Sequence, residues 1–303
     1  MAMITSALLT ALRTAFRSEF QTALTETPSD YDKIATVVPS TSASNTYGWL
    51  GQFPSLREWI GDRVVKDMKA HGYAVTNKLW ESTVGVQRTD IEDDNVGVYK
   101  PLMAEMGRAA KVQPDELAFA LLKAGGATTC YDGQFFFDTD HPVYANVDGT
   151  GAVTTVANIQ PGAGAGPAWY LLDCSRAVKP IIFQKRLEPE FTEMTDGKDE
   201  SVFMKDLYRY GVRARNNVGF GFWQMAYKST QDLTADNFNA AYAAMTSQKA
   251  DGGRPLGIRP TLLVVPPSLR QQALNITKAE LIGNGVTNVN AGLVDTLVTP
   301  WVL

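Results

Sequence analysis

The chain has 303 residues, of which 45% are hydrophobic and 20% are charged, and its formal net charge is −4. This composition is ordinary for one large globular domain or two intertwined ones, and it excludes a disordered chain. No apolar run approaches the roughly 20 residues that span a bilayer, and the acidic balance argues against general attraction to nucleic acid or anionic lipid. Two cysteines are too few for a disulfide scaffold, so we expect reduced thiols in a cytoplasm.

Apolar residues recur at four-residue spacing near the N-terminus, which predicts an amphipathic helix. Thr5 or Ser6 can cap its first turn, while Arg13 and Arg17 interrupt the run and exclude a secretory signal peptide. Such a helix either docks on its own domain or forms an arm that packs on a neighbouring subunit. The sequence favours neither. The apolar positions are Leu8, Leu12, Phe16, Phe20 and Leu24.

Residues 34–88 have the composition of an extended β arm. A change in the parity of its apolar positions predicts a bulge or strong twist between Leu79 and Val84. A hairpin is barely stable alone, so its aromatic rings need cover from the same chain or from another copy. We predict intersubunit contacts from nine aromatic and charged residues: Trp49, Phe53, Arg57, Glu58, Trp59, Arg63, Lys66, Lys69 and Trp80.

An acidic turn follows, with four carboxylates between Asp90 and Asp94. Carboxylates of this kind can bind a hard cation, but Asn95 stands where an EF-hand loop requires glycine. Acidic residues before a helix also cap free N–H groups and complement the helix dipole. We therefore predict a structural corner whose carboxylates cap a long helix from Asn95 to Ala124, kinked near Pro114.

The segment 130–142 holds a thiol, three carboxylates and a histidine. A metal-dependent hydrolase could use Asp138, Asp140 and His141, and a cysteine enzyme could pair Cys130 with His141. Catalytic zinc usually takes three protein ligands, and a thiol nucleophile needs an oriented base and an oxyanion site, which this spacing does not define. Its Asp-Gly, Asp-Thr-Asp and His-Pro sequences are common in turns. We predict a hydrogen-bonded surface loop, with no catalytic residue, metal or cofactor.

Two glycine-containing segments are incomplete binding motifs. Gly162 and Gly164 begin like a dinucleotide fingerprint, but Pro167 stands in place of the third glycine. The run from Val218 to Met225 echoes an RNA-recognition signature but lacks its basic first residue. We predict a surface excursion over residues 147–167, and a half-buried strand over 218–227 with glycines at points of close packing.

The C-terminal half mixes helices and strands without a regular βαβ rhythm, which predicts the α+β class. Strands over 177–186, 203–215 and 218–227 are expected to form one antiparallel sheet. Thr234 is predicted to cap a helix over 235–249. A buried strand over 261–265, a helix from Pro266 to 275 and a β-like piece over 292–303 complete the prediction.

Four runs, in this order, carry a resemblance to a known family: TYGWLGQFPSLREWIGDR, KLWESTVGVQRTDIEDDNVGVY, CYDGQFFFDTDHP and RPTLLVVPPSLR. Over essentially the whole chain, the sequence resembles the major head (capsid) subunit of Mu-like phages and prophages, the gpT family. The resemblance implies the α+β shell fold of tailed-phage major capsid proteins, first defined in the Hong Kong phage. It implies an N-terminal arm (1–44), an extended β-hairpin loop (45–94), a peripheral domain with a spine helix (95–231) and a mainly axial domain (232–303) that exchanges strands with it.

The resemblance also implies a structural protein and not an enzyme. Copies would assemble through hexameric and pentameric rings into an icosahedral head shell around double-stranded DNA, with non-specific DNA contact and no membrane. The location would be the virion, after assembly in the bacterial host cytoplasm. Portal and head-completion proteins would be partners, as would a separate scaffolding protein, since no long helical extension of the kind some relatives carry is present. Two alternatives stay open: an encapsulin-like nanocompartment shell, and the hydrolase described above.

Overall fold

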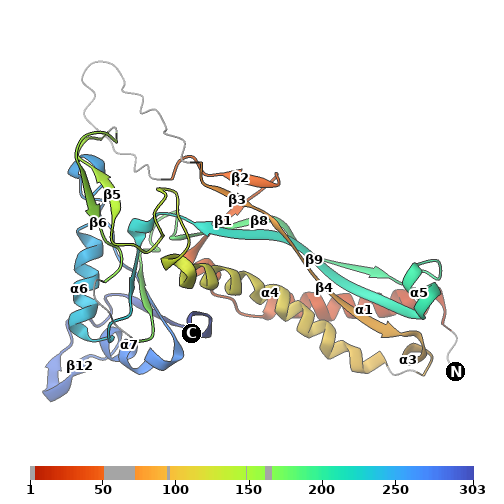
Figure 1. Ribbon diagram of the computed structural model, residues 1–303. Helices are drawn as coiled ribbons and strands as arrows, with labels where there is room; N and C mark the ends of the chain where they lie inside the picture. Colours follow the sequence, from red (N-terminus) through yellow and green to blue (C-terminus); the bar gives the residue numbers. More distant parts are fainter. Residues whose placement is uncertain (1–3, 51–71, 94–95, 148, 161–165) are drawn as a thin grey trace.

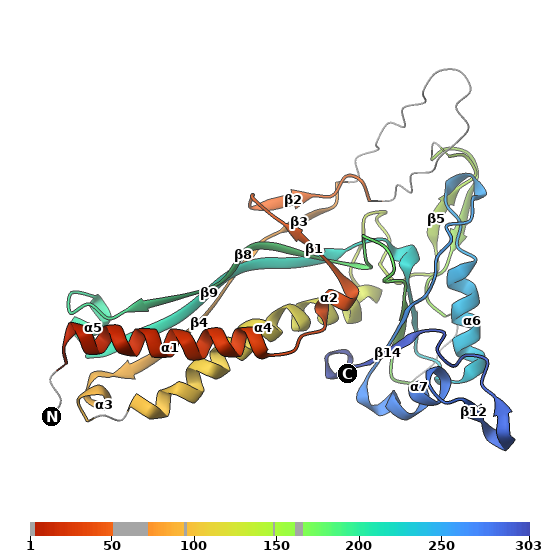
Figure 2. The same ribbon diagram turned by 180° about the vertical axis from the view of Figure 1, so that it is seen from behind.

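The computed structural model describes residues 4–50, 72–93, 96–147, 149–160 and 166–303. These residues form a long limb joined to a broader body (Figure 1). Figure 2 shows the same arrangement from behind, with two long helices, α1 (Ser6–Glu26) and α4 (Lys100–Lys123), running side by side along the limb. The limb thus contains α1 and α4, whereas later parts of the chain build the body.

A four-stranded sheet in the order β1-β8-β9-β4 forms the limb. β1 (Ala35–Pro39) is parallel to β8 (Ile181–Met194), and β9 (Leu207–Phe220) lies antiparallel to both β8 and β4 (Lys78–Gln87). The strands expected within 177–186 and 203–215 are present as parts of the antiparallel pair β8 and β9, but β8 continues to Met194, so residues 181–185 pair with 216–220 and not with 203–215. The turn between β8 and β9 contains a short helix, α5 (Glu200–Lys205), at the free end of the limb (Figure 1).

The predicted N-terminal helix is present as α1, and Thr5 caps it by accepting a hydrogen bond from the Leu8 N–H at 3.2 Å. In this subunit α1 docks on its own chain. Phe16 packs edge-on against Tyr210 of β9, with ring centroids 5.0 Å apart. α4 approaches closely because Gly107 has no side chain: a Cβ there would lie 2.3 Å from the carbonyl oxygen of Phe20. Leu12, Phe16 and Phe20 are thereby buried.

The long helix predicted over 95–124 is confirmed, but its predicted capping is wrong. Asp90 and Glu92 lie in a short helix, α3 (Arg88–Glu92), and a 3₁₀ turn (Val96–Tyr99) stands between them and α4. Asp90 accepts a hydrogen bond from the Tyr99 hydroxyl at 2.5 Å. The first turn of α4, which the structure describes fully, contains no acidic residue and no side-chain cap. Asp94 lies outside the described residues.

Of the bulge or strong twist predicted between Leu79 and Val84, the bulge is absent. β4 pairs with β9 in one continuous register from Lys78 to Gln87. The change of parity arises at Asn77, which separates β3 (Ala74–Thr76) from β4. β3 instead pairs with β2 (Ser44–Thr46). The register shifts of this sheet occur in β8, on either side of Leu187.

A second sheet, in the order β10-β7-β11-β14, forms the centre of the body. Its strands are β7 (Trp169–Leu172), β10 (Ala226–Ser229), β11 (Leu262–Val265) and β14 (Asp295–Val298). The strand predicted over 218–227 therefore does not lie in one sheet. It leaves the limb at Gly221, whose N–H donates to the Pro180 carbonyl at 2.7 Å, and where a Cβ would meet the Lys179 carbonyl at 2.4 Å. The close-packing role predicted for its glycines is confirmed.

The remaining elements surround this second sheet. α6 (Ala235–Thr246) begins at its predicted cap, Thr234, and α7 (Arg270–Thr277) follows a 3₁₀ turn at Pro267–Leu269. β5 (His141–Tyr144) pairs with β6 (Val153–Val156), so part of the surface excursion predicted over 147–167 is a strand. β12 (Leu281–Ile282) pairs with β13 (Val286–Thr287). A short helix, α2 (Tyr31–Ile34), connects α1 to β1.

Candidate functional site

Seven of the nine predicted intersubunit residues lie outside the described residues: Phe53, Arg57, Glu58, Trp59, Arg63, Lys66 and Lys69. The other two are half-buried in their own chain. Trp49 packs edge-on against Tyr47 and Phe222, with ring centroids 6.0 and 5.9 Å apart. Trp80 donates from Nε1 to the Asn216 carbonyl at 3.3 Å. Contacts of these residues with another copy stay a prediction.

Exposed apolar side chains gather on the β12–β13 hairpin and the residues after it, at the corner of the body farthest from α5 (Figures 1 and 2). We call this set the body tip: Leu281, Ile282, Val286, Val289 and Leu293. Val289 is 84% exposed and Leu281 61%. Such a gathering is typical of an interaction surface, whereas single exposed apolar residues are ordinary.

The body tip is held firmly although it projects into solvent. The buried side chain of Asn288 donates from Nδ2 to three carbonyl oxygens at the end of α7, at 2.8–3.1 Å. The Asn288 N–H also donates to the Glu280 carbonyl at 2.9 Å. A partner would therefore meet a surface whose backbone is already ordered, which lowers the entropy cost of binding.

A second exposed apolar pair lies on α5. We call Phe203 and Met204 the limb tip; they are 79% and 69% exposed. Asp206, with φ of 54°, ends the helix in the left-handed conformation. Its carbonyl accepts from the Arg88 N–H at 3.0 Å, and the Arg88 guanidinium lies 3.5 Å from its carboxylate. These contacts connect the limb tip to α3, the short helix that follows β4.

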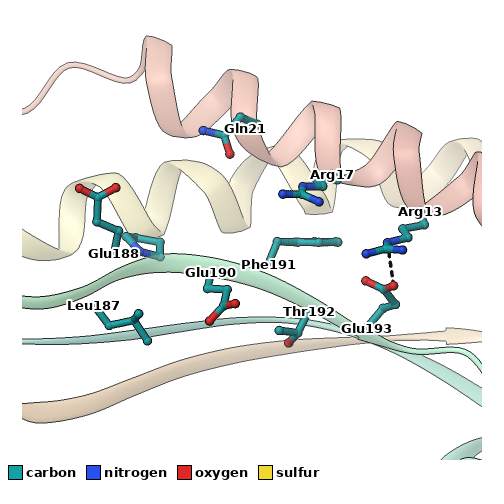
Figure 3. Close-up of a pocket in the computed structure, with 10 residues that line it drawn as sticks. Arg13, Arg17, Gln21, Leu187, Glu188, Glu190, Phe191, Thr192 and Glu193 are labelled. Carbon is teal, nitrogen blue, oxygen red and sulfur yellow. Dashed lines mark ion pairs between the residues drawn. The ribbon is translucent and has the colours of Figure 1, made fainter.

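A groove with a volume of ≈ 570 Å³ lies between α1 and β8 (Figure 3). Arg13, Arg17 and Gln21 line its helix side, and residues 187–193 line its strand side. An ion pair of 2.7 Å between Arg13 Nε and Glu193 Oε1 crosses it. Because Arg13 is half-exposed, this pair contributes little to stability. The groove follows the edge of β8 beyond the last residue that pairs with β1, Lys185.

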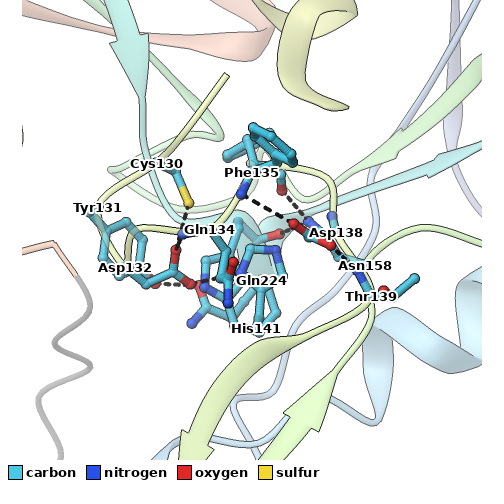
Figure 4. A network of polar contacts seen from close by, with 12 residues as sticks. Cys130, Tyr131, Asp132, Gln134, Phe135, Asp138, Thr139, His141, Asn158 and Gln224 are labelled. Carbon is cyan, nitrogen blue, oxygen red and sulfur yellow. Dashed lines mark hydrogen bonds and ion pairs between the residues drawn. The ribbon is translucent and has the colours of Figure 1, made fainter. Parts of the chain in front are cut away.

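The hydrogen-bonded surface loop predicted over 130–142 is only partly at the surface. Asp140 is exposed, but His141 is fully buried and Cys130 is buried, so the prediction is wrong for these two residues, which belong to a buried polar cluster. The Cys130 thiol donates to Asp132 Oδ1 at 3.0 Å, and His141 Nδ1 lies 2.7 Å from Asp132 Oδ2 (Figure 4). The His141 ring stacks on Trp223, with centroids 3.9 Å apart and planes 8° apart. Contact with Trp223, far along the chain, is what buries this loop.

Asp132 is the centre of this cluster. Burial alone would raise the pKa of its carboxyl group, but hydrogen bonds from His141 and Cys130 outweigh that and lower it. Burial, with the Asp132 charge beside it, raises the pKa of the Cys130 thiol well above its usual range. The thiol is therefore protonated at neutral pH and is a poor nucleophile. The sequence reasoning did not place Asp132 here, although the Cys-x-Asp spacing before Gly133 is a signal for a shared turn.

The hydrolase set of Asp138, Asp140 and His141 does not form one ligand group, because His141 joins Cys130 and Asp132 instead. Asp138 accepts from the Thr139 N–H at 2.7 Å, and its own N–H donates to Asn158 Oδ1 at 2.9 Å. It is therefore engaged in stabilising the loop. Asp140 is exposed, and a hydrogen bond with Asp138 raises the pKa of its carboxyl group. Only His141 points into the buried cluster.

No helix among the described residues is long and apolar enough to cross a bilayer. Residues 9–302 match the family model of the Mu-like prophage major head subunit gpT. The Mu-like prophage FluMu major head subunit of Haemophilus influenzae is 54% identical over 283 residues, covering 93% of this chain and 92% of the relative. The major capsid protein of Escherichia phage Mu is 50% identical over 289 residues, covering 95% of each chain.

Two solved structures from bacteriophage JBD30 are similar over nearly the whole chain. The procapsid structure matches with a TM-score of 0.88 and 64% identity, covering 98% of this chain and 100% of that chain. The capsid structure matches with a TM-score of 0.78 and 47% identity, covering 100% of both chains. At 64% and 47% identity, these two structures resemble this chain in sequence as well as in fold.

Proposed function

The chain belongs to the Mu-like prophage major head subunit family, gpT, and from that premise we propose how its copies assemble. It is a phage major capsid protein, a structural component of the virion and not an enzyme, and it has the α+β fold of that class. We propose that copies form hexameric and pentameric rings that join into an icosahedral shell around double-stranded DNA. The family match over residues 9–302 carries this conclusion.

The proposal divides the chain by role. Residues 1–44 would serve as an N-terminal arm, 45–94 as an extended hairpin loop, 95–231 as a peripheral domain with α4 as its spine, and 232–303 mainly as an axial domain. β7 and β10, from within 95–231, pair in one sheet with β11 and β14 from within 232–303. That mixed sheet supports the expectation that the two domains exchange strands.

The distribution of exposed apolar side chains supports a ring-forming role. The body tip and the limb tip lie at opposite ends of the molecule (Figure 1). Two separate contact surfaces on one chain permit two kinds of contact, one that closes a ring by rotation and one that joins rings. We propose that body tips meet near the centre of each ring, and that limb tips meet copies at its rim.

Other partners are proposed on the same premise. A separate scaffolding protein, a portal and head-completion proteins would complete the particle. Contact with packaged DNA would be weak and independent of base sequence, because the net charge of −4 leaves only local Lys and Arg side chains to contact phosphates. The comparisons favour neither alternative, the nanocompartment shell or the hydrolase.

Substitution at the body tip tests the ring contact. Val289→Asp places a charge where a partner would remove water, so we expect particle yield to fall at least about tenfold. Because Val289 is 84% exposed in the single chain, unfolding stability should change by less than about 0.5 kcal/mol. Sedimentation and electron microscopy measure yield, and thermal denaturation measures folding.

The matched control is Val153→Asp on β6, which puts the same charge on a residue that is 51% exposed and lies away from both tips. It should assemble like the unmodified chain. Wild-type particle yield from Val289→Asp, or equal loss from both variants, would contradict the role assigned to the body tip.

A further inference from the structure

We propose that Cys130, Asp132 and His141 bind one zinc ion per subunit as its three protein ligands. Among the described residues, these three form the one group of His, Cys, Asp and Glu side chains whose ligand atoms lie within 4.8 Å of one another. The inference does not depend on the proposed assembly, because the cluster lies inside the body and away from both tips. Figure 4 shows the three side chains turned toward one another.

Local structure fixes the ligands before any ion binds. Cys130 and Asp132 belong to one turn, in which the Gly133 N–H donates to the Cys130 carbonyl at 3.2 Å and the Cys130 N–H donates to the Gln134 carbonyl at 2.8 Å. Gly133 allows this turn because its φ is +90°. His141 is the first residue of β5, so the paired strands hold its ring. Ligands held in this way need little reorganisation.

The spacing of the ligand atoms is close to what zinc requires. Zinc binds Cys sulfur at about 2.3 Å and His nitrogen or carboxylate oxygen at about 2.0–2.2 Å, so neighbouring ligands of a tetrahedral ion lie roughly 3.3–3.7 Å apart. Here the Cys130 Sγ to Asp132 Oδ1 distance is 3.0 Å, and the His141 Nδ1 to Asp132 Oδ2 distance is 2.7 Å. Shifts of less than about 1 Å would admit the ion between the thiolate, the carboxylate and the imidazole.

The charges and chemical nature of the ligands select the ion. One thiolate and one carboxylate neutralise a divalent cation, which matters because an uncompensated charge is costly at a buried site. Thiolate and imidazole favour zinc, whereas magnesium and calcium prefer oxygen ligands. Binding releases the thiol proton to solvent and transfers the ring proton of His141 from Nδ1 to Nε2.

A hydrogen-bonded network without an ion is the competing explanation. In that form Asp132 accepts from Cys130, from His141 and from the Gln134 N–H at 3.1 Å. His141 Nε2 is buried and has no hydrogen-bond partner among the described residues, and an ion bound at Nδ1 would leave it so, with the ring proton on it. This atom therefore does not distinguish the two forms, and bound metal must be measured directly.

Metal content of the full chain tests the proposal. The purified protein is loaded with zinc and dialysed, and its metal is then measured by mass spectrometry. The chain should retain about one zinc ion per subunit, and Cys130→Ser and His141→Gln should each weaken binding by more than about 100-fold. Cys174→Ser is the control, because Cys174 lies outside the cluster and should leave zinc binding unchanged.

Cobalt provides a readout that needs no variant. Bound to the unmodified chain in place of zinc, Co²⁺ should give a thiolate-to-metal charge-transfer band, and zinc should displace it stoichiometrically. If the unmodified chain retains no more zinc than Cys130→Ser, or if cobalt gives no such band, the site is a hydrogen-bonded cluster only and the proposal is overturned. Failure of either test would leave the assembly proposal unaffected.

Discussion

The body and the limb bury their apolar residues in two separate clusters. The main core lies in the body and the near part of the limb, and it holds the largest fully buried side chains, among them Trp169, Trp223 and Tyr170. The limb cluster is smaller, and one helix, α1, contributes Leu12, Phe16 and Phe20 to it. Elements that bury fewer apolar contacts open at lower free energy, so the limb should open locally while the main core stays folded.

This difference bears on assembly because α1 lies in the proposed N-terminal arm. In this subunit α1 covers its own limb. A copy whose arm moved onto a neighbour would uncover Tyr210 and the rest of the limb cluster, which would then need another cover. Among the described residues, α1 contributes none to the main core, so movement of α1 would leave that core covered. The stability of the limb should therefore be coupled to assembly, whereas the stability of the body should not be coupled to assembly.

The largest expected effect is in the main core. Trp169 is fully buried and donates from Nε1 to the Gln231 carbonyl at 2.8 Å. Trp169→Ala should lower the free energy of unfolding by about 3–5 kcal/mol, because it leaves a large cavity. Chemical denaturation followed by circular dichroism measures this loss. A loss below about 1 kcal/mol would mean that the main core is not the rigid half of the molecule.

A smaller and local effect is expected where α1 meets α4. Gly107→Ala places a Cβ 2.3 Å from the Phe20 carbonyl oxygen, so the two helices must move apart. Overpacking of this kind costs about 1–3 kcal/mol, and the better helix propensity of alanine returns roughly 1 kcal/mol of that. Hydrogen exchange should rise in α1 and stay unchanged in β7 and β11.

Gly97→Ala is the matched control, because no described atom lies within 4 Å of a Cβ at that position. It should leave exchange in α1 as it is in the unmodified chain. Equal protection of α1 in both variants would contradict the view that close helix packing holds the limb together. Loss of protection throughout the body in Gly107→Ala would show that the two clusters unfold as one.

The smallest expected effect concerns the hydrogen bonds that join α4 to the chain between α1 and β1. Asp115 on α4 accepts hydrogen bonds from the backbone N–H groups of Asp30 and Tyr31 at 2.9 and 2.7 Å. Burial raises the pKa of its carboxyl group above the usual 3.8, and these hydrogen bonds only partly offset the rise. A raised folded-state pKa means that the stabilising contribution is present at low pH and is lost as pH rises through that pKa.

Asp115→Asn keeps an acceptor oxygen and removes the buried charge. Stability at pH 7 should change by less than about 1 kcal/mol, and the dependence of stability on pH just above 3.8 should flatten. Asp115→Ala, which removes the acceptor, should cost about 2 kcal/mol at pH 7. Thermal midpoints measured across pH check both. An unchanged pH dependence in Asp115→Asn would show that Asp115 does not titrate as described.

Local signals in the sequence predicted local structure well. The Thr234 cap predicted the start of α6, and the apolar stripe after residue 95 predicted α4, since both depend on residues a few positions apart. The prediction for the corner at Asp90 was wrong in detail, because Asp90 and Glu92 lie in an additional short helix, α3. A capping pattern cannot reveal whether another turn intervenes before the helix.

Features that depend on distant contacts could not be predicted in the same way. The strand predicted over 218–227 is divided between two sheets, because Gly221 meets the backbone of Lys179 and Pro180. The loop at Cys130 is buried because His141 stacks on Trp223. Of the predicted intersubunit residues, the structure describes Trp49 and Trp80, which pack on their own chain, and contacts with another copy stay a prediction.

Electron microscopy of the expressed chain, with particle mass measured on the same sample, tests the central claim most directly. The account predicts closed shells of uniform size, formed alone or with a head scaffolding protein, and predicts that Val289→Asp yields folded subunits without shells. A strictly monomeric chain, even with scaffolding protein present, would contradict the account.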